Sequence, residues 1–149
     1  DVLMWNLYLP TEYKPNLALK TLSPADYAAN LDELIAAAGD KYILLQEAGC
    51  SAGYETNSTI ESSAQKQKEA VAVLFDKVQN TRIRAFFWFT MVDWSRELTD
   101  SYTASLSGLP QPFVDSIAEL LRTYGLVEID GTERIGWSEF IKGCEELYP

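Results

Sequence analysis

Histidine is absent from all 149 residues of the chain. This excludes Ser-His-Asp and Cys-His catalytic machinery, histidine-ligated zinc and histidine proton relays within the chain. If side chains of this protein transfer protons, carboxylates or tyrosines must do so.

Cysteine and glycine-rich loops are also scarce. Cys50 and Cys144 are the two cysteines, too few for a disulfide framework or a cysteine zinc site. No glycine-rich phosphate-binding loop follows any predicted strand, which argues against a nucleotide site. We therefore expect neither a metal nor a cofactor.

Positive charge is the third shortage. The chain has 12 Lys and Arg residues against 22 Asp and Glu residues, a net charge of −10. Nucleic acids and anionic membrane surfaces both need a basic face, so we expect neither as a partner. No apolar run approaches the roughly 18–20 residues of a membrane span. A neutral ligand is compatible with this charge.

The composition that remains is that of a globular domain. Hydrophobic residues make up 47% of the chain and charged residues 23%, enough apolar surface for a core. We find no repeat, linker or low-complexity tract, so the sequence predicts a single domain over residues 1–149.

The most informative stretch is KYILLQEAGC, residues 41–50. An apolar run, Tyr42 to Leu45, is followed closely by the carboxylate of Glu47. Such a run is typical of a buried parallel strand, here predicted over Lys41–Glu47. In α/β proteins the C-terminal ends of parallel strands carry the functional groups, which makes Glu47 the first candidate site residue.

The remaining segments alternate around this strand. Ser23 and Pro24 fit the start of a helix and Gly39 its end. The other predicted elements are strands at Val2–Leu9 and Ile83–Val92, helices at about Ile60–Gln79, from Pro112, and at about Trp137–Leu147, a hairpin or turn at Leu126–Arg134, and loops at Thr11–Thr21 and Ser95–Gln111. The order βαβαβα predicts an α/β fold with a parallel sheet and right-handed crossovers.

Polar and aromatic side chains follow the predicted strands. Asn6 and Tyr8 share a face of the first strand, Glu47 ends the second, and Trp88 and Asp93 lie at or after the end of the third. If they converge on one rim, a carboxylate nucleophile would stand beside a phenol and an indole, which suits a sugar ring. The residues also leave plainer alternatives open: Glu47 as a solvated strand end, Asn6 and Tyr8 as ordinary strand residues, Trp88 as plain core and Asp93 as a loop cap.

Four motifs carry a resemblance to a known family: WNLY at 5–8, LLQEAG at 44–49, AFFWFTMVDW at 85–94 and YGLVEIDGTERIGWSEF at 124–140. In this order they resemble the C-terminal part of the (β/α)8-barrel glycoside hydrolases of the clan whose catalytic glutamates lie on strands four and seven. The resemblance covers nearly the whole chain and corresponds to strands six to eight.

The resemblance implies a partial, or half, TIM barrel: three parallel βα units with a C-terminal hairpin or turn and a terminal helix. It assigns the catalytic nucleophile to Glu47 and sugar binding to Asn6, Tyr8, Trp88 and Asp93. A full barrel needs about 250 residues, and the family's acid/base glutamate has no counterpart here. The resemblance therefore implies a carbohydrate ligand, weak or no activity alone, and bare sheet edges that would pair with another copy or a missing barrel half.

Two further interpretations remain. The chain could be a non-catalytic module that forms oligomers or binds saccharide without cleaving it. It could also be a small doubly wound α/β protein unrelated to sugars, which a strand order other than sequential would favour.

Overall fold

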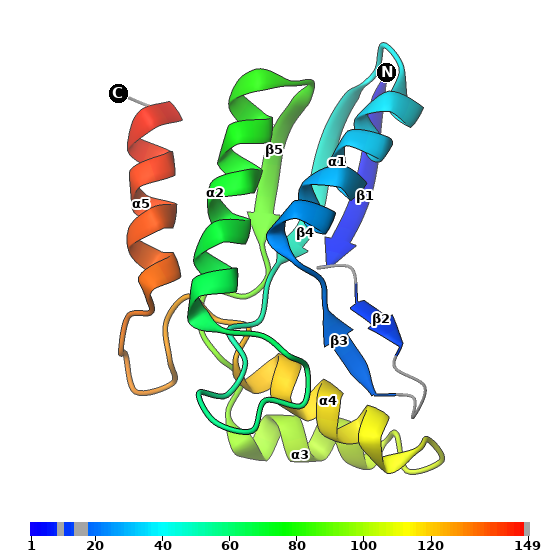
Figure 1. Cartoon of the computed structure of the whole chain (residues 1–149), viewed down its shortest axis with the longest axis vertical. Coiled ribbons are helices and arrows are strands. Elements are labelled where there is room, and N and C mark those ends of the chain that lie inside the picture. The colour runs from blue at the N-terminus through cyan, green and yellow to red at the C-terminus, as the bar shows by residue number, and fades with distance from the viewer. Residues whose placement is uncertain (9–10, 14–17, 148–149) are drawn as a thin grey trace.

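The computed structural model describes residues 1–8, 11–13 and 18–147, and at positions 7, 8 and 11–13 it describes the backbone alone. Strands and helices alternate along much of the chain (Figure 1). The strands are β1 (Val2–Tyr8), β2 (Thr11–Tyr13), β3 (Leu19–Thr21), β4 (Tyr42–Gly49) and β5 (Ile83–Trp88); the helices are α1 (Pro24–Ala38), α2 (Ala64–Asn80), α3 (Arg96–Ala104), α4 (Gln111–Arg122) and α5 (Ile135–Leu147).

The main sheet has three strands in the order β1-β4-β5, all parallel. The predicted α/β class, the parallel pairing and the sequential strand order are thereby confirmed. The helix signals at Ser23 were also correct: its hydroxyl accepts the backbone N–H of Asp26, and Pro24 opens α1.

Three helices cover one face of this sheet: α1, α2 and α5. Their apolar side chains and those of β4 and β5 form the main core, in which Tyr27, Leu31, Ile43, Leu45 and Leu74 have no exposed surface. Burying a side chain of this size stabilises a fold by about 1.5–3 kcal/mol, so this layer is the main source of stability.

Phe140 of α5 is the centre of an aromatic cluster within that core. Its ring meets those of Phe75, Phe86 and Trp88 edge-on at 5.4, 6.1 and 6.5 Å between centroids and stacks on Trp137 at 6.3 Å. Such pairs contribute about 0.5–1.5 kcal/mol each beyond the area they bury. The cluster joins α5, α2 and β5 into one layer.

The C-terminal ends of the strands are covered by further structure (Figure 1), part of which the sequence interpretation missed. Residues 11–21, predicted as a loop, contain β2 and β3, which pair antiparallel. Residues 95–111, also predicted as a loop, contain α3, whose N-cap hydroxyl on Ser95 accepts the N–H of Leu98. A second apolar cluster, formed by Leu19, Ile60, Leu120 and Tyr124, lies under α4.

Several predicted boundaries need correction. The third strand ends at Trp88 rather than Val92, because the chain leaves the sheet there and Val92 makes an isolated bridge to Val127 instead. Helix α2 starts at Ala64, not Ile60, because Ser63 caps it and Ile60 packs in the second cluster. The predicted end of the first strand at Leu9 lies outside the described residues.

Two predictions near the C-terminus, the turn and the last helix, agree with the structure. The turn around Asp130-Gly131 is present, with Glu128 N–H donating to the carbonyl of Thr132 at 2.8 Å. The last helix begins at Ile135, two residues before the predicted start at Trp137. Among the described helices, none combines the length and the apolar character needed to cross a membrane.

In the part of the chain that the structure describes, no helix packs on the opposite face of the sheet. Val2 and Met4 on β1 and Phe87 on β5 are 60%, 56% and 61% exposed. Tyr42 on β4 is also exposed, with the Arg84 guanidinium 4.5 Å above its ring. We call this surface the open face; its apolar side chains lie on both edge strands.

Candidate functional site

The position of Glu47 is set by an irregularity in β4. Ile43 and Leu45 point into the helix-side core, as does Ala48, so the alternation of the strand changes phase between Leu45 and Ala48. The pairing with β1 shows the same shift, since Trp5 pairs with Leu45 but Asn6 pairs with Glu47. One extra residue, Gln46, forms a bulge, and such bulges redirect side chains. Glu47 therefore lies on the open face.

The carboxylate of Glu47 is half-buried and incompletely satisfied. Its Oε2 atom is inaccessible to solvent and has no hydrogen-bond partner among the described residues. A buried carboxylate oxygen without a donor costs free energy unless a ligand or another group supplies one. Oε2 therefore marks Glu47 as a candidate for contact with a donor that the described residues do not supply.

Asn6 is the neighbour of Glu47 across the β1–β4 pairing. Its side chain is exposed, and as register partners on one face the two residues lie next to each other. The backbone of Tyr8 ends β1 and pairs with Gly49. The predicted role of the Tyr8 phenol concerns a side chain outside the described residues. Of the predicted site residues, the structure brings Asn6 and Glu47 together.

Trp88 takes a different position from the one that the sugar-floor interpretation requires. It pairs with Ala48 rather than with Glu47, is 8% exposed, and packs edge-on against Phe140 of α5. The indole is therefore on the helix side of the sheet. Its Nε1–H is buried and has no acceptor among the described residues. The role of Trp88 as a subsite floor stays a prediction.

Asp93 sits in a buried ion pair beyond the end of β5. Its Oδ2 accepts the guanidinium of Arg134 at 2.7 Å, and its Oδ1 accepts the backbone N–H of Gly125 at 2.8 Å. Burial raises the pKa of the Asp93 carboxyl above its usual value, and the hydrogen bond and charge of Arg134 oppose this. This geometry matches the loop-cap alternative; the predicted sugar contact stays a prediction.

Glu119 on α4 is a polar residue that sequence reasoning missed. Its carboxylate is buried and accepts four hydrogen bonds from the loop after β4: Tyr54 N–H at 2.9 Å, Ser58 Oγ at 2.6 Å, and Thr59 N–H and Oγ1 at 2.7 and 2.5 Å. Each oxygen thus has two donors, and the loop that follows Glu47 is fixed to α4.

We call these four hydrogen bonds of Glu119 the Glu119 clamp. The sequence contained a signal for it. Ser116, Glu119 and Thr123 recur at a helical spacing of three and four residues, and all three are buried. Ser116 Oγ accepts the N–H of Leu19, and Thr123 Oγ1 accepts the N–H of Gly53. A polar stripe at helical spacing beside apolar positions indicates a helix face buried against backbone.

Gln67 fixes the same region from α2. Its Nε2 lies 2.9 Å from the carbonyl oxygen of Cys50 and 3.0 Å from that of Gly125. The residue is fully buried, so these bonds join the loop after β4 to the segment between α4 and α5 without solvent competition. The sequence interpretation had not given Gln67 a role.

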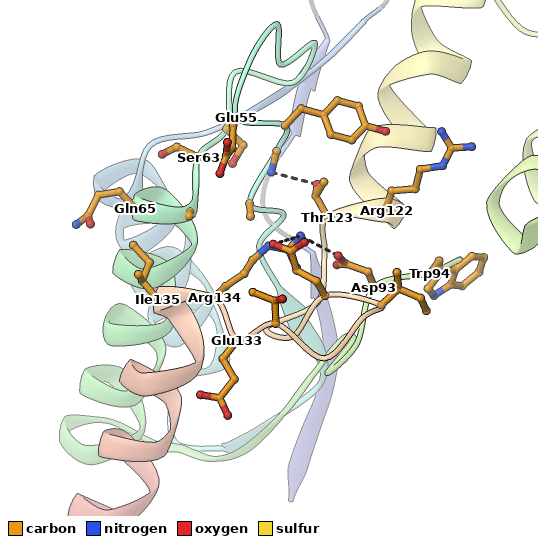
Figure 2. A pocket seen from close by; sticks show the side chains of 18 of the residues that line it. Glu55, Ser63, Gln65, Asp93, Trp94, Arg122, Thr123, Glu133, Arg134 and Ile135 are labelled. Carbon is orange, nitrogen blue, oxygen red and sulfur yellow. Dashed lines mark hydrogen bonds and ion pairs between the residues drawn. The ribbon is translucent and has the colours of Figure 1, made fainter. Parts of the chain in front are cut away.

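A cleft of about 1000 Å³ opens beside these loops. Figure 2 shows Gln65 and Ile135 on one side, Arg122 and Trp94 on the other, and the Asp93–Arg134 ion pair between them. None of Asn6, Glu47 and Trp88 lines this cleft. Within the described ranges, no three metal-ligating side chains gather in a way that could hold an ion.

The comparisons with known proteins support a relation of fold. No family model matches the chain, and no curated protein matches it either. Among solved structures, a β-glucuronidase from Faecalibacterium prausnitzii is similar with a TM-score of 0.62 at 16% identity, covering 100% of this chain and 22% of that one. The chain is also similar to a GH2 β-galacturonidase from Eisenbergiella tayi.

Two structures of the galacturonidase, with different bound molecules, are similar to this chain. The structure bound to glycerol gives a TM-score of 0.57 and that bound to galacturonate 0.56, both at 17% identity and 97% coverage of this chain. The chain spans less than a quarter of the length of these enzymes. Its fold is thus that of a part of glycoside hydrolase chains.

Proposed function

We propose that the chain is the nucleophile-bearing part of a retaining glycoside hydrolase barrel, with Glu47 as the nucleophile. The observation that carries the proposal is the bulge in β4, which places Glu47 on the open face with one buried oxygen lacking a donor. Structural similarity to glycoside hydrolase chains supports the same family. The finer assignment, to the clan with catalytic glutamates on strands four and seven, rests on the LLQEAG resemblance.

In this mechanism a Glu47 oxygen attacks the anomeric carbon of a glycoside. The bond from that carbon to the leaving-group oxygen breaks, and an acid protonates the departing oxygen. Water then hydrolyses the glycosyl ester. Retaining enzymes hold the acid about 5–5.5 Å from the nucleophile, and in this proposal the acid lies outside the chain, so we expect little turnover from the chain alone.

The roles of the other site residues follow from their placement. Asn6, beside Glu47, would hydrogen-bond a sugar hydroxyl through its amide, which both donates and accepts. Tyr8 and Asp93 remain predicted sugar-binding residues in this proposal, and Trp88 would join them only if its indole turned from the helix side of the sheet toward Glu47. The substrate class that we favour is a β-linked uronide, because the similar structures are a β-glucuronidase and a β-galacturonidase.

The proposal also concerns the open face. Exposed apolar side chains on both edge strands support packing against further parallel strands, as in a half TIM barrel that pairs with a missing half. Each edge strand offers a row of unpaired backbone groups to such a partner. No nucleic-acid or membrane partner is part of the proposal, given the net charge of −10.

Glycosyl fluorides test the nucleophile directly, because fluoride departs without protonation and no acid is needed. The 149-residue chain is incubated with 2-deoxy-2-fluoroglucuronyl fluoride and its galacturonyl counterpart, and the intact mass and peptide map are recorded. We expect a glycosyl adduct on Glu47, lost in Glu47→Gln and kept in Glu55→Gln. An adduct on another residue, or none after prolonged incubation, would refute the proposal.

A second candidate is a non-catalytic module that assembles with copies of itself, and the open face favours it. Light scattering over a range of concentrations decides this version: a monomer at all concentrations rules out self-assembly. If oligomers form and the fluorosugars leave Glu47 unlabelled, this candidate replaces the first.

A further inference from the structure

The cleft beside the strand ends is built from segments that are distant in sequence. Its described lining comes from the loop after β4 (52–55), the start of α2 (62–65), the loop after β5 (93–96), the end of α4 (122–123) and the turn before α5 (128–135). Convergence of separate loops at the C-terminal ends of parallel strands is the usual situation of a ligand site in an α/β fold.

Hydrogen bonds between these segments fix the walls. Ala52 N–H donates to the carbonyl of Thr123 at 2.7 Å, and Trp94 N–H donates to that of Leu121 at 3.1 Å. The Asp93–Arg134 ion pair, 2.7 Å long and almost fully buried, closes the floor between them (Figure 2). The cleft is therefore largely preformed, which lowers the cost of ordering on binding.

Charged side chains of both signs line the cleft, and some of them have no ion-pair partner among the described residues. Arg134 forms an ion pair with Asp93, and Arg122 forms one with Asp100. Arg96, Glu55 and Glu133 form no ion pair or side-chain hydrogen bond with any described residue. A guanidinium and two carboxylates that face one cavity can both donate to and accept from a ligand.

Aromatic surface is available in the same place. Trp94 is half-buried with its ring edge-on to Tyr102 at 5.9 Å between centroids, and Tyr54 is 39% exposed. Both line the cleft. Trp and Tyr offer a flat apolar face together with a polar atom, which matches a ligand with an apolar ring face and a rim of hydroxyl groups.

We propose that this cleft is a binding site for a neutral saccharide, separate from the Glu47 site. The free groups are one guanidinium and two carboxylates, a net negative charge that disfavours an anion, and sugar hydroxyls can satisfy both kinds of group. Trp94 and Tyr54 supply the surface for the ring, and Arg96, Glu55 and Glu133 supply the polar contacts. The inference does not require Glu47 to be a nucleophile.

The test is a titration of the 149-residue chain with cellobiose and xylobiose as neutral probes and glucuronate as a charged probe, followed by calorimetry and tryptophan fluorescence. We expect the disaccharides to bind at the cleft, and any glucuronate binding, which the proposed function places at Glu47, to be unaffected by changes in the cleft. Trp94→Ala and Arg96→Ala should each weaken disaccharide binding at least about tenfold, a loss of about 1.4 kcal/mol.

Two matched variants separate this site from the rest of the chain. Trp5→Ala removes an exposed tryptophan of β1 outside the cleft, and Arg84→Ala removes an exposed arginine of β5 outside it. Both should bind disaccharide as the parent does. The inference is overturned if neither disaccharide binds, if Trp94→Ala and Arg96→Ala bind disaccharide normally, if these two variants weaken glucuronate binding more than disaccharide binding, or if Glu47→Gln alone abolishes disaccharide binding; that last result would leave the proposed function intact.

Discussion

The two faces of the β1-β4-β5 sheet are made by the same strands but differ in what covers them. On one face, α1, α2 and α5 leave Leu31, Ile43 and Leu74 with no exposed surface. On the other face, Met4 and Phe87 remain more than half exposed. Stability thus comes from the covered face, whereas the open face, which carries Glu47, is available for function or for a partner.

The largest expected effect is on the covered face. Leu74→Ala should lower the free energy of unfolding by about 2–5 kcal/mol, because it removes apolar contacts and leaves a cavity in a packed core. Urea denaturation followed by circular dichroism measures this. Met4→Ala on the open face is the control and should change stability by no more than about 0.5 kcal/mol; equal losses in both would mean that the open face is not open in solution.

The ends of the strands are closed by polar contacts rather than apolar ones, and Glu119 tests that closure. Glu119→Gln replaces one acceptor oxygen by a donor NH2 group that faces two of the four donors. We expect a loss of about 1–3 kcal/mol, the cost of unsatisfied buried groups, and faster hydrogen exchange at Tyr54 and Thr59. Asp115→Asn, on the exposed side of the same helix, should change neither quantity.

A smaller effect concerns pH and the Asp93–Arg134 pair. Because the folded pKa of Asp93 is raised, its contribution to stability is fully present below its unfolded pKa of about 3.9. That contribution is lost as pH rises through the folded pKa. Above the folded pKa of Asp93, Asp93→Asn should be less stable than the parent because Arg134 loses its charged partner. The stability of Asp93→Asn should also lack the decline between the unfolded and folded pKa values.

Chemical denaturation at a series of pH values compares the two proteins. If the stability of the parent instead rises relative to Asp93→Asn between pH 4 and 6, the direction of the Asp93 shift is wrong.

The smallest effect on stability belongs to the open face, where association is the informative measurement. Phe87→Ser should change the free energy of unfolding by less than about 0.5 kcal/mol. It should nevertheless weaken any self-association, because it removes exposed apolar surface from an edge strand. Sedimentation velocity of Phe87→Ser and of the parent compares the two; stronger association in the variant would contradict the open face as the contact surface.

Much of the fold could be predicted from local signals. Ser23, Pro24 and Gly39 bound α1, and the apolar run before Glu47 lies in β4, because capping and burial are read over a few residues. Helix α3 was missed because its exposed face carries Leu98 and Tyr102, which gives no inward apolar stripe. The strands β2 and β3 are too short for an alternating pattern of apolar and polar residues to be recognised in the sequence.

The site was harder to predict than the fold because it depends on contacts between distant segments. The pairing of Asp93 with Arg134 spans 41 residues and the clamp of Glu119 on Tyr54 spans 65, and neither follows from local spacing. Trp88 shows the limit of motif reasoning: its place at a strand end was correct, but which side of the sheet it faces depends on the packing of α5.

The bulge at Gln46 has a consequence for how such chains are compared. Whether the Glu47 carboxylate points outward or among the helices depends on its spacing from Leu45 together with the bulge that absorbs Gln46, not on the identity of the acid. With Gln46 kept but no bulge, regular alternation would turn the Glu47 carboxylate into the apolar layer, whereas deleting Gln46 would make the strand regular and leave Glu47 on the open face. The spacing of the strand is therefore a character to track in its own right when distant sequences are sorted into active and inactive forms.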